Sequence, residues 1–326
     1  MKWSLVLVLL AVSAGPAMAG ELFVLGGATK DTGNSHQSFG YQTEYREGLA
    51  ENLAVSASYL NEGHVPNHHR DGLAPLMLWG RANLVDRRLS LAVGAGPYIF
   101  ADTMTTTTPV RNMHGVGGIL GGSATWYLDS RLLFQVRANW TVTSNNIDTV
   151  TLLAGIGYQL DPPPVPGPLP KPPSQREKTT SNEVTVYAGQ TVVNNPGSSR
   201  SLAVCAEYRR GLLPYLDVTA SWLNEENDRL TRRNGLVSQA WLVRDFMGDH
   251  LALGVGGGVY LAVDRRSPTV PTDGSSSFVS GIISATASMR NFSFDPNLTA
   301  RLTMNRIVTN YDRDTDMFLL GVGYRF

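Results

Sequence analysis

Apolar and polar residues alternate along most of this chain, and a period of two residues is typical of β-strands. The clearest case is residues 134–143 (FQVRANWTVT), where apolar side chains occupy the even positions and polar side chains the odd positions. One face of this strand is therefore apolar and the opposite face is polar.

The same alternation predicts eight strands in the first half of the chain. We expect them at residues 21–29, 37–46, 53–62, 73–83, 89–101, 115–127, 131–143 and 149–160. The short connections are residues 47–52, 84–88 and 129–130, and the longer polar ones are residues 63–72 and 102–114. Short turns that alternate with longer loops are typical of membrane β-barrels, which have turns on one side and loops on the other.

The second half of the chain repeats the first. Residues 53–62 (LAVSASYLNE) recur as 216–225 (LDVTASWLNE), and the tripeptide EYR at 44–46 recurs at 207–209. Further along, VGAGPY at 93–98 matches VGGGVY at 255–260, and LAGIGY at 153–158 matches LLGVGY at 319–324. The chain therefore contains two copies of one unit, and the second copy should hold a matching set of strands.

These features divide the chain into four segments. Residues 1–19 carry a positive charge, an apolar run and small residues before Gly20, which predicts a secretory signal peptide. The first copy covers residues 20–160 and the second covers 183–326. Between them, residues 161–182 begin with a proline-rich stretch that favours an extended, semi-rigid linker.

The export signal and the strand length favour strands that cross a membrane with their apolar faces outward. Apart from the signal, no stretch contains the roughly 18 consecutive apolar residues that a spanning helix requires. The final residues 318–326 (FLLGVGYRF) resemble the C-terminal assembly signal of Gram-negative outer-membrane barrels. This resemblance implies an all-β protein in the outer membrane of a Gram-negative bacterium, in contact with lipid, lipopolysaccharide and the barrel assembly machinery.

Two architectures are open, and they differ in function. Two eight-stranded barrels would have lumens filled by side chains, whereas one sixteen-stranded barrel would enclose a water channel, as in a porin. Two barrels are favoured by the linker and by a repeated charge pair that we expect inside the lumen, Glu44 with Arg137 and Glu207 with Arg301. Because buried charges need partners, we interpret these pairs as structural.

Composition narrows the chemistry. The formal net charge is zero, which gives no basic surface for nucleic acid. A single cysteine, Cys205, excludes both an internal disulfide and a cysteine-rich metal site. We expect it to be a small packed strand residue.

Histidines are concentrated in the first copy, which holds five of the six, at positions 36, 64, 68, 69 and 114. Imidazole and carboxylate groups in one loop could hold a divalent metal such as zinc or copper. The candidate ligands are Glu62, His64, His68, His69 and Asp71. The alternative is a solvated polar loop, and the second copy has no histidine in the matching segment.

Both copies also share Asn-Glu and Arg-x-Gly in this segment, at residues 61–62 and 70–72 and again at 224–225 and 233–235. A feature present in both copies could brace the same part of each barrel.

Each copy also resembles the lipid A deacylase group of small outer-membrane barrels, through its glycine-rich fifth strand and Val136-Arg137-Ala138 in the seventh. That family uses a histidine and, two residues later, a serine on this strand for ester cleavage. This chain has neither residue at 139–143, so no catalytic residue is transferred. Our leading hypothesis is a non-enzymatic barrel whose surface loops contact lipid, a ligand or another surface. A passive porin is the alternative, and a lipid A-modifying acyl hydrolase is the third candidate.

Overall fold

The computed structural model describes ten stretches of the chain. They are residues 19–34, 36–104, 111–144, 146–161, 165–169, 178–194, 199–225, 232–266, 279–309 and 313–326. The predicted signal peptide, except for residue 19, lies outside the described residues, and so does much of the predicted linker.

The first copy is a closed barrel in which each strand pairs with the next and β1 pairs with β8, all antiparallel. Its strands are β1 (Ala19–Asp31), β2 (Gln37–Ala50), β3 (Leu53–Val65), β4 (His68–Leu84), β5 (Leu89–Met104), β6 (Arg111–Tyr127), β7 (Leu132–Thr143) and β8 (Thr149–Gln159). All eight strands expected from alternation are present. Closure pairs the edge strands, which an open sheet in lipid could not do.

The second copy is a second closed antiparallel barrel, in which β9 pairs with β16. Its strands are β9 (Asn182–Val193), β10 (Arg200–Leu213), β11 (Leu216–Glu225), β12 (Arg232–Phe246), β13 (Leu251–Arg266), β14 (Val279–Met289), β15 (Leu298–Val308) and β16 (Thr315–Arg325). The fold is therefore a tandem duplication of an eight-stranded barrel. The alternative of one sixteen-stranded barrel is wrong, because each sheet closes on itself.

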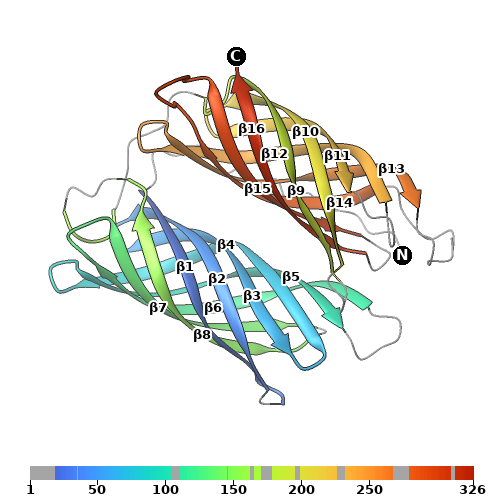
Figure 1. The fold of residues 1–326 in the computed structure, drawn as a ribbon. Helices are drawn as coiled ribbons and strands as arrows, with labels where there is room; N and C mark the ends of the chain where they lie inside the picture. The colour runs from blue at the N-terminus through green and yellow to red at the C-terminus, as the bar shows by residue number, and fades with distance from the viewer. Residues whose placement is uncertain are drawn as a thin grey trace.

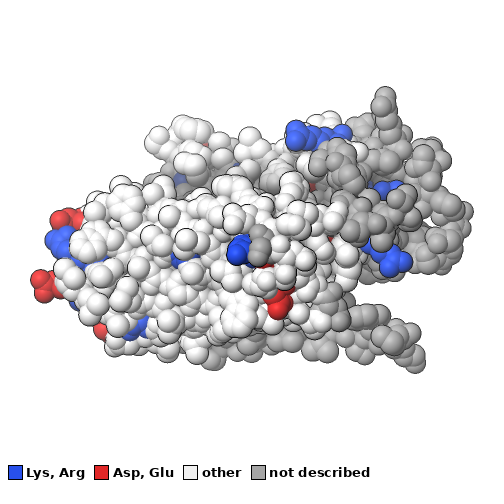
Figure 2. All heavy atoms as spheres, turned by 90° about the horizontal axis from the view of Figure 1, so that it is seen from below, with Lys and Arg blue, Asp and Glu red and all other residues white. Residues whose placement is uncertain are grey.

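Side chains alternate between the lumen and the outside of each barrel. On β7, the polar side chains of Gln135, Arg137 and Asn139 are buried in the lumen, whereas Phe134 and Trp140 are exposed on the outside. Figure 2 shows one outer face as a broad surface with few charged residues, which lie towards its two ends apart from a small group near the middle. Within the described residues, no helix is long and apolar enough to cross a bilayer.

The two barrels lie side by side, as Figure 1 shows, with the first in blue to green and the second in yellow to red. The two barrels have the same orientation, so that the ends with the short turns lie together and the opposite ends lie together. Near the short turns, Glu47 contacts Arg244, and near the opposite ends Asp71 contacts Arg306. We call the end that carries the short turns the turn end, and the opposite end the loop end.

The connection between β3 and β4 differs from the expected long loop over residues 63–72. The strands continue to Val65 and resume at His68, so only Pro66 and Asn67 form the turn. Asn67 has a φ of 70°, a left-handed conformation that asparagine tolerates in tight hairpin turns. Polar composition here marks strands that extend beyond the apolar belt rather than a loop.

Because no strand is shared between the barrels, we predict that each copy folds without the other. Residues 178–326, exported behind a signal peptide, should reach a folded form whose gel migration changes on heating. The same is expected of residues 1–169. If only the full chain shows this shift, the two sheets depend on each other for closure.

Candidate functional site

The turn-end half of the first lumen is filled by a charged cluster on an aromatic base. Glu44 binds Arg137 at 2.7 Å and Arg46 at 2.8 Å, and all three side chains are almost completely buried. Both guanidinium groups lie over the ring of Trp79, at 4.2 and 4.4 Å from its centre. The structure thus joins Glu44 and Arg137 across the lumen, and it adds Arg46 and Trp79 to the pair.

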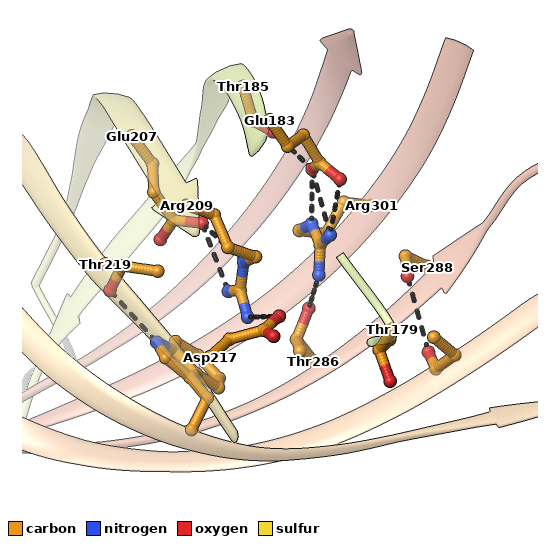
Figure 3. Close-up of polar contacts among 12 residues, drawn as sticks. Thr179, Glu183, Thr185, Glu207, Arg209, Asp217, Thr219, Thr286, Ser288 and Arg301 are labelled. Atoms are coloured by element: carbon orange, nitrogen blue, oxygen red, sulfur yellow. Dashed lines mark hydrogen bonds and ion pairs between the residues drawn. The ribbon is translucent and has the colours of Figure 1, made fainter. Parts of the chain in front are cut away.

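The second lumen uses a different arrangement of the repeated residues, drawn in Figure 3. Arg301 binds Glu183 at 2.9 Å, not Glu207 as the sequence led us to expect. Glu207 instead accepts hydrogen bonds from Arg209, at 3.1 Å for the closer nitrogen, and Arg209 also faces Asp217 at 3.5 Å.

One difference in strand register and one substitution between the copies account for this correction. Arg301 lies opposite Ser288, two residues nearer the turn end than the position that corresponds to Arg137. Glu183 occupies the position of Glu21, but in the first copy that carboxylate accepts a hydrogen bond from Tyr127 at 2.9 Å. Asp217 occupies the position of Ala54, which gives Arg209 a second carboxylate that Arg46 does not have. Arg301 is then matched by Glu183, and Arg209 by Glu207 and Asp217.

Trp79 and Trp241 are the site residues that our sequence reasoning missed. Their indole N–H groups donate to Ser56 at 2.8 Å and to Thr219 at 3.0 Å, respectively. Arg209 lies 4.4 Å from the centre of the Trp241 ring, as Arg46 does from that of Trp79. The recurrence of a tryptophan at the same place in both copies was the available signal.

The repeated glycines of β5 and β13 make room for these indoles. A Cβ atom at Gly94 would overlap the Trp79 ring, and one at Gly256 would overlap the Trp241 ring. Glycine is therefore needed in both copies because the tryptophan lies flat against the neighbouring strand.

A second charged tier lies nearer the loop end of each lumen. Arg70 binds Glu62, and Arg233 binds Glu225 at 2.7 Å. Each arginine also donates to a threonine at the start of the last strand, Thr149 at 2.9 Å in the first copy and its counterpart in the second at the same distance. The residues shared between the copies thus form an equivalent internal brace in each barrel.

The five candidate metal ligands do not come together. Glu62 points into the lumen and binds Arg70, and His68 binds Asp102 there. His69 and Asp71 point outward, because neighbouring residues of a strand face opposite sides. The His64 and His69 rings contact each other with centres 4.3 Å apart. Among the described residues, no group of three possible ligands could hold a metal ion.

The strand that resembles the lipid A deacylase group is occupied by lumen contacts. Asn139 donates to Gln42 and to Thr151, both at 2.9 Å, and Thr141 donates to Glu62 at 3.0 Å. The polar side chains that follow Arg137 on this strand therefore form hydrogen bonds inside the lumen.

At the turn end, the barrels meet through one arginine of the second barrel. Arg244 binds Glu47 and, at 3.1 Å, Asp161, and it donates to the hydroxyl of Tyr45 at 3.0 Å. Phe246 packs against Tyr45 with ring centres 6.1 Å apart.

At the loop end, a second arginine of the same barrel joins the two. Arg306 binds Asp71 at 2.7 Å and Asp316 at 3.4 Å. His114 contacts Asp314 across the same boundary. Charged side chains on the outside of one barrel thus form ion pairs with charged side chains on the outside of the other. We call these two sets of contacts the inter-barrel clasps.

The outward charges of the strands support this interpretation. Among strand residues with described side chains, eight outward positions carry Asp, Glu, Lys or Arg. They are Lys30, Glu47, Asp71, Arg200, Arg210, Arg244, Arg306 and Asp316. Five belong to the clasps, and the other three lie near strand ends. Charge is thus placed on the outer walls where the other barrel covers it or where a strand leaves the apolar belt.

No protein-family model matches the chain, and no curated protein matches it. Among solved structures, the N-terminal β-barrel domain of Pseudomonas aeruginosa OprF is 11% identical, with a TM-score of 0.35, and covers 43% of this chain and 98% of its own. Ail, the attachment invasion locus protein of Yersinia pestis, is 10% identical, with a TM-score of 0.34, over 44% of this chain and 97% of its own.

An outer membrane channel from Pseudomonas putida F1 is 13% identical, with a TM-score of 0.23, over 95% of this chain and 96% of its own. Similarity this weak says nothing about what the chain binds or does.

The duplicated carboxylates Glu44 and Glu207 offer a matched test of the lumen clusters. Glu44→Gln should lower the free energy of unfolding by about 3 kcal/mol, because it leaves Arg46 and Arg137 buried without a carboxylate partner. Glu207→Gln should cost clearly less, because Asp217 still faces Arg209. Urea unfolding in lipid vesicles measures both, and equal losses would contradict the assigned pairing.

The clasps should hold the barrels together after the linker is cut. With a specific protease site in place of residues 172–176, the cleaved halves should still comigrate on a native gel. Arg244→Gln with Arg306→Gln should separate them, because removing one partner of a buried charge pair costs about 2–5 kcal/mol. The matched control is Arg200→Gln with Arg210→Gln, which should leave the halves together.

Proposed function

We propose that this chain is an outer-membrane protein in which two closed, non-conducting barrels form one rigid membrane anchor, and that its role is non-enzymatic. The observation that carries the proposal is the pair of charged tiers that fills each lumen. The anchor would hold the loop ends of both barrels at fixed positions on the cell surface, for contact with lipid, a ligand or another surface.

The apolar outer walls support insertion into a bilayer. Exposed large apolar side chains occur on the outside of both barrels, such as Phe134 and Trp140 in the first and Leu320 and Val322 in the second. A soluble barrel would place such side chains in its interior. The strands have 10 to 17 residues, enough for a tilted strand to cross the hydrocarbon core.

The filled lumens oppose transport of solutes through either barrel. Arg70 and Arg137 are each almost inaccessible in the first barrel, as are Arg209 and Arg233 in the second. Two cavities in the described part of the second barrel hold about 10 Å³ each, near the size of a single water molecule. An ion would have to displace charges that are already paired in a low-dielectric interior.

The proposal also covers assembly and partners. The terminal strand β16 ends at Arg325, directly before Phe326, and it closes the second barrel against β9. We propose that this strand is the one presented to the barrel assembly machinery, and that lipid and lipopolysaccharide surround the apolar walls.

The proposal predicts that the purified protein does not conduct. In a planar bilayer, the full chain should give no stable conductance steps, whereas a porin added to the same membrane should give them. Stable large steps from the wild-type chain would overturn the sealed-lumen proposal. Insertion is checked separately, by flotation of the same sample with lipid vesicles.

A further inference from the structure

The described ends of the linker do not lie free of the barrels. At the turn end of the first barrel, Leu169 is 8% exposed, and the carbonyl oxygens of residues 167–169 all accept hydrogen bonds from this barrel. The donors are Gln159 at 3.0 Å to Gly167, Arg87 to Pro168 and Arg81 at 3.5 Å to Leu169. Side chains of the first barrel thus bind three successive main-chain carbonyl groups of the linker.

The other end of the linker covers the turn end of the second barrel. Thr179 and Thr180 are 5% and 2% exposed. Arg290 donates to the carbonyl oxygen of Thr179, and the amide of Gly211 donates to that of Ser181 at 3.2 Å. Arg290 is itself held by Asp245 at 2.6 Å.

The same repeated glycine receives the linker in both barrels. Gly48 and Gly211 end the matching sequences EYREG and EYRRG of β2 and β10. A Cβ atom at Gly48 would overlap the carbonyl oxygen of Leu169, and one at Gly211 would overlap that of Thr180. Neither glycine has a left-handed backbone that would explain it otherwise. Close approach of a second main chain is therefore the local reason for glycine.

We propose that the turn-end mouth of each barrel is a binding site for the main-chain carbonyl groups of a peptide, built from a glycine and an arginine, and that the linker occupies both sites in cis. Arginine suits this role because its guanidinium group offers several donors in a fixed geometry. The linker then closes both mouths on the side opposite the loops.

Prolines fit the first site for a physical reason. The residue whose carbonyl group Arg87 binds is Pro168, and proline lacks an amide donor. All three bonds to this segment use linker carbonyl groups, so the site asks for no amide donor from the peptide.

Cysteine labelling of the full chain tests the proposal. In a Cys205→Ser background, Leu169→Cys should react with a bulky polyethylene glycol maleimide about tenfold more slowly than Val165→Cys, because reaction requires local opening. Val165 is 50% exposed in the same linker and is the matched control. Thr180→Cys should likewise react more slowly than Lys178→Cys. Equal rates within either pair would overturn docking at that barrel.

Each glycine should control only its own site. Gly48→Val should raise the rate of Leu169→Cys to about that of Val165→Cys and leave Thr180→Cys unchanged. Gly211→Val should do the reverse, because each Cβ overlaps one carbonyl group. A variant that raises both rates, or neither, contradicts a separate site on each barrel.

A variant in the β4–β5 turn tests the first site in case Gly48→Val does not fold. Arg87 lies between β4 and β5, outside the barrel wall, and Arg87→Gln removes the donor to Pro168 together with the ion pair to Glu51 in the β2–β3 turn. If Gly48→Val loses the heat-dependent gel shift of a folded barrel, Arg87→Gln must raise the labelling of Leu169→Cys instead. No change there overturns the first site. The labelling does not depend on conductance, so the proposed function and this site can fail independently.

Discussion

The lumen of a narrow barrel has no room for the water that would solvate a buried charge, so each charge needs a protein partner. The rest of the structure depends on this constraint. With eight strands, the lumen is only wide enough for side chains, so each carboxylate must meet an arginine or a hydroxyl inside the wall. Glu44 between two guanidinium groups, stacked on Trp79, is the tightest instance. The same requirement explains the repeated tryptophan and the glycine opposite it. It also explains the second charged tier, which contains Arg70.

The two barrels solve this requirement with different pairings from one ancestral pattern. In the second barrel, Arg301 is paired with Glu183, and Arg209 is paired with Glu207 and Asp217, whereas in the first barrel Glu44 binds both Arg46 and Arg137. The same barrel architecture therefore accommodates different pairings of the repeated charges. The outer walls of the two barrels also differ. The positions of the first barrel that match Arg244 and Arg306 are Ala82 and Trp140, which carry no charge, so the clasp arginines have no counterparts there.

The contacts outside the lumens link three parts of the chain. The clasps fix the barrels against each other, and the linker is bound to both mouths at the turn end. Asp161 takes part in the turn-end clasp although it opens the linker. Rigid placement of both barrels thus depends on groups that lie between them rather than within either sheet.

Alternation and repetition in the sequence were enough to predict the strands and the two copies, because side-chain direction in a strand has a strict period of two. They favoured two eight-stranded barrels over one sixteen-stranded barrel, but only the pairing of β1 with β8 and of β9 with β16 decided between them. The joining of Glu44 to Arg137 followed from the need to pair buried charges. The sequence could not assign Arg301 to Glu183, because several carboxylates face one small lumen and their distances depend on barrel shear. Nor could it separate His68 from His69, since composition suggested a loop where the strands continue. The tertiary structure alone decided which outward charges meet across the barrels and where the linker binds, because these contacts join residues that no local pattern relates.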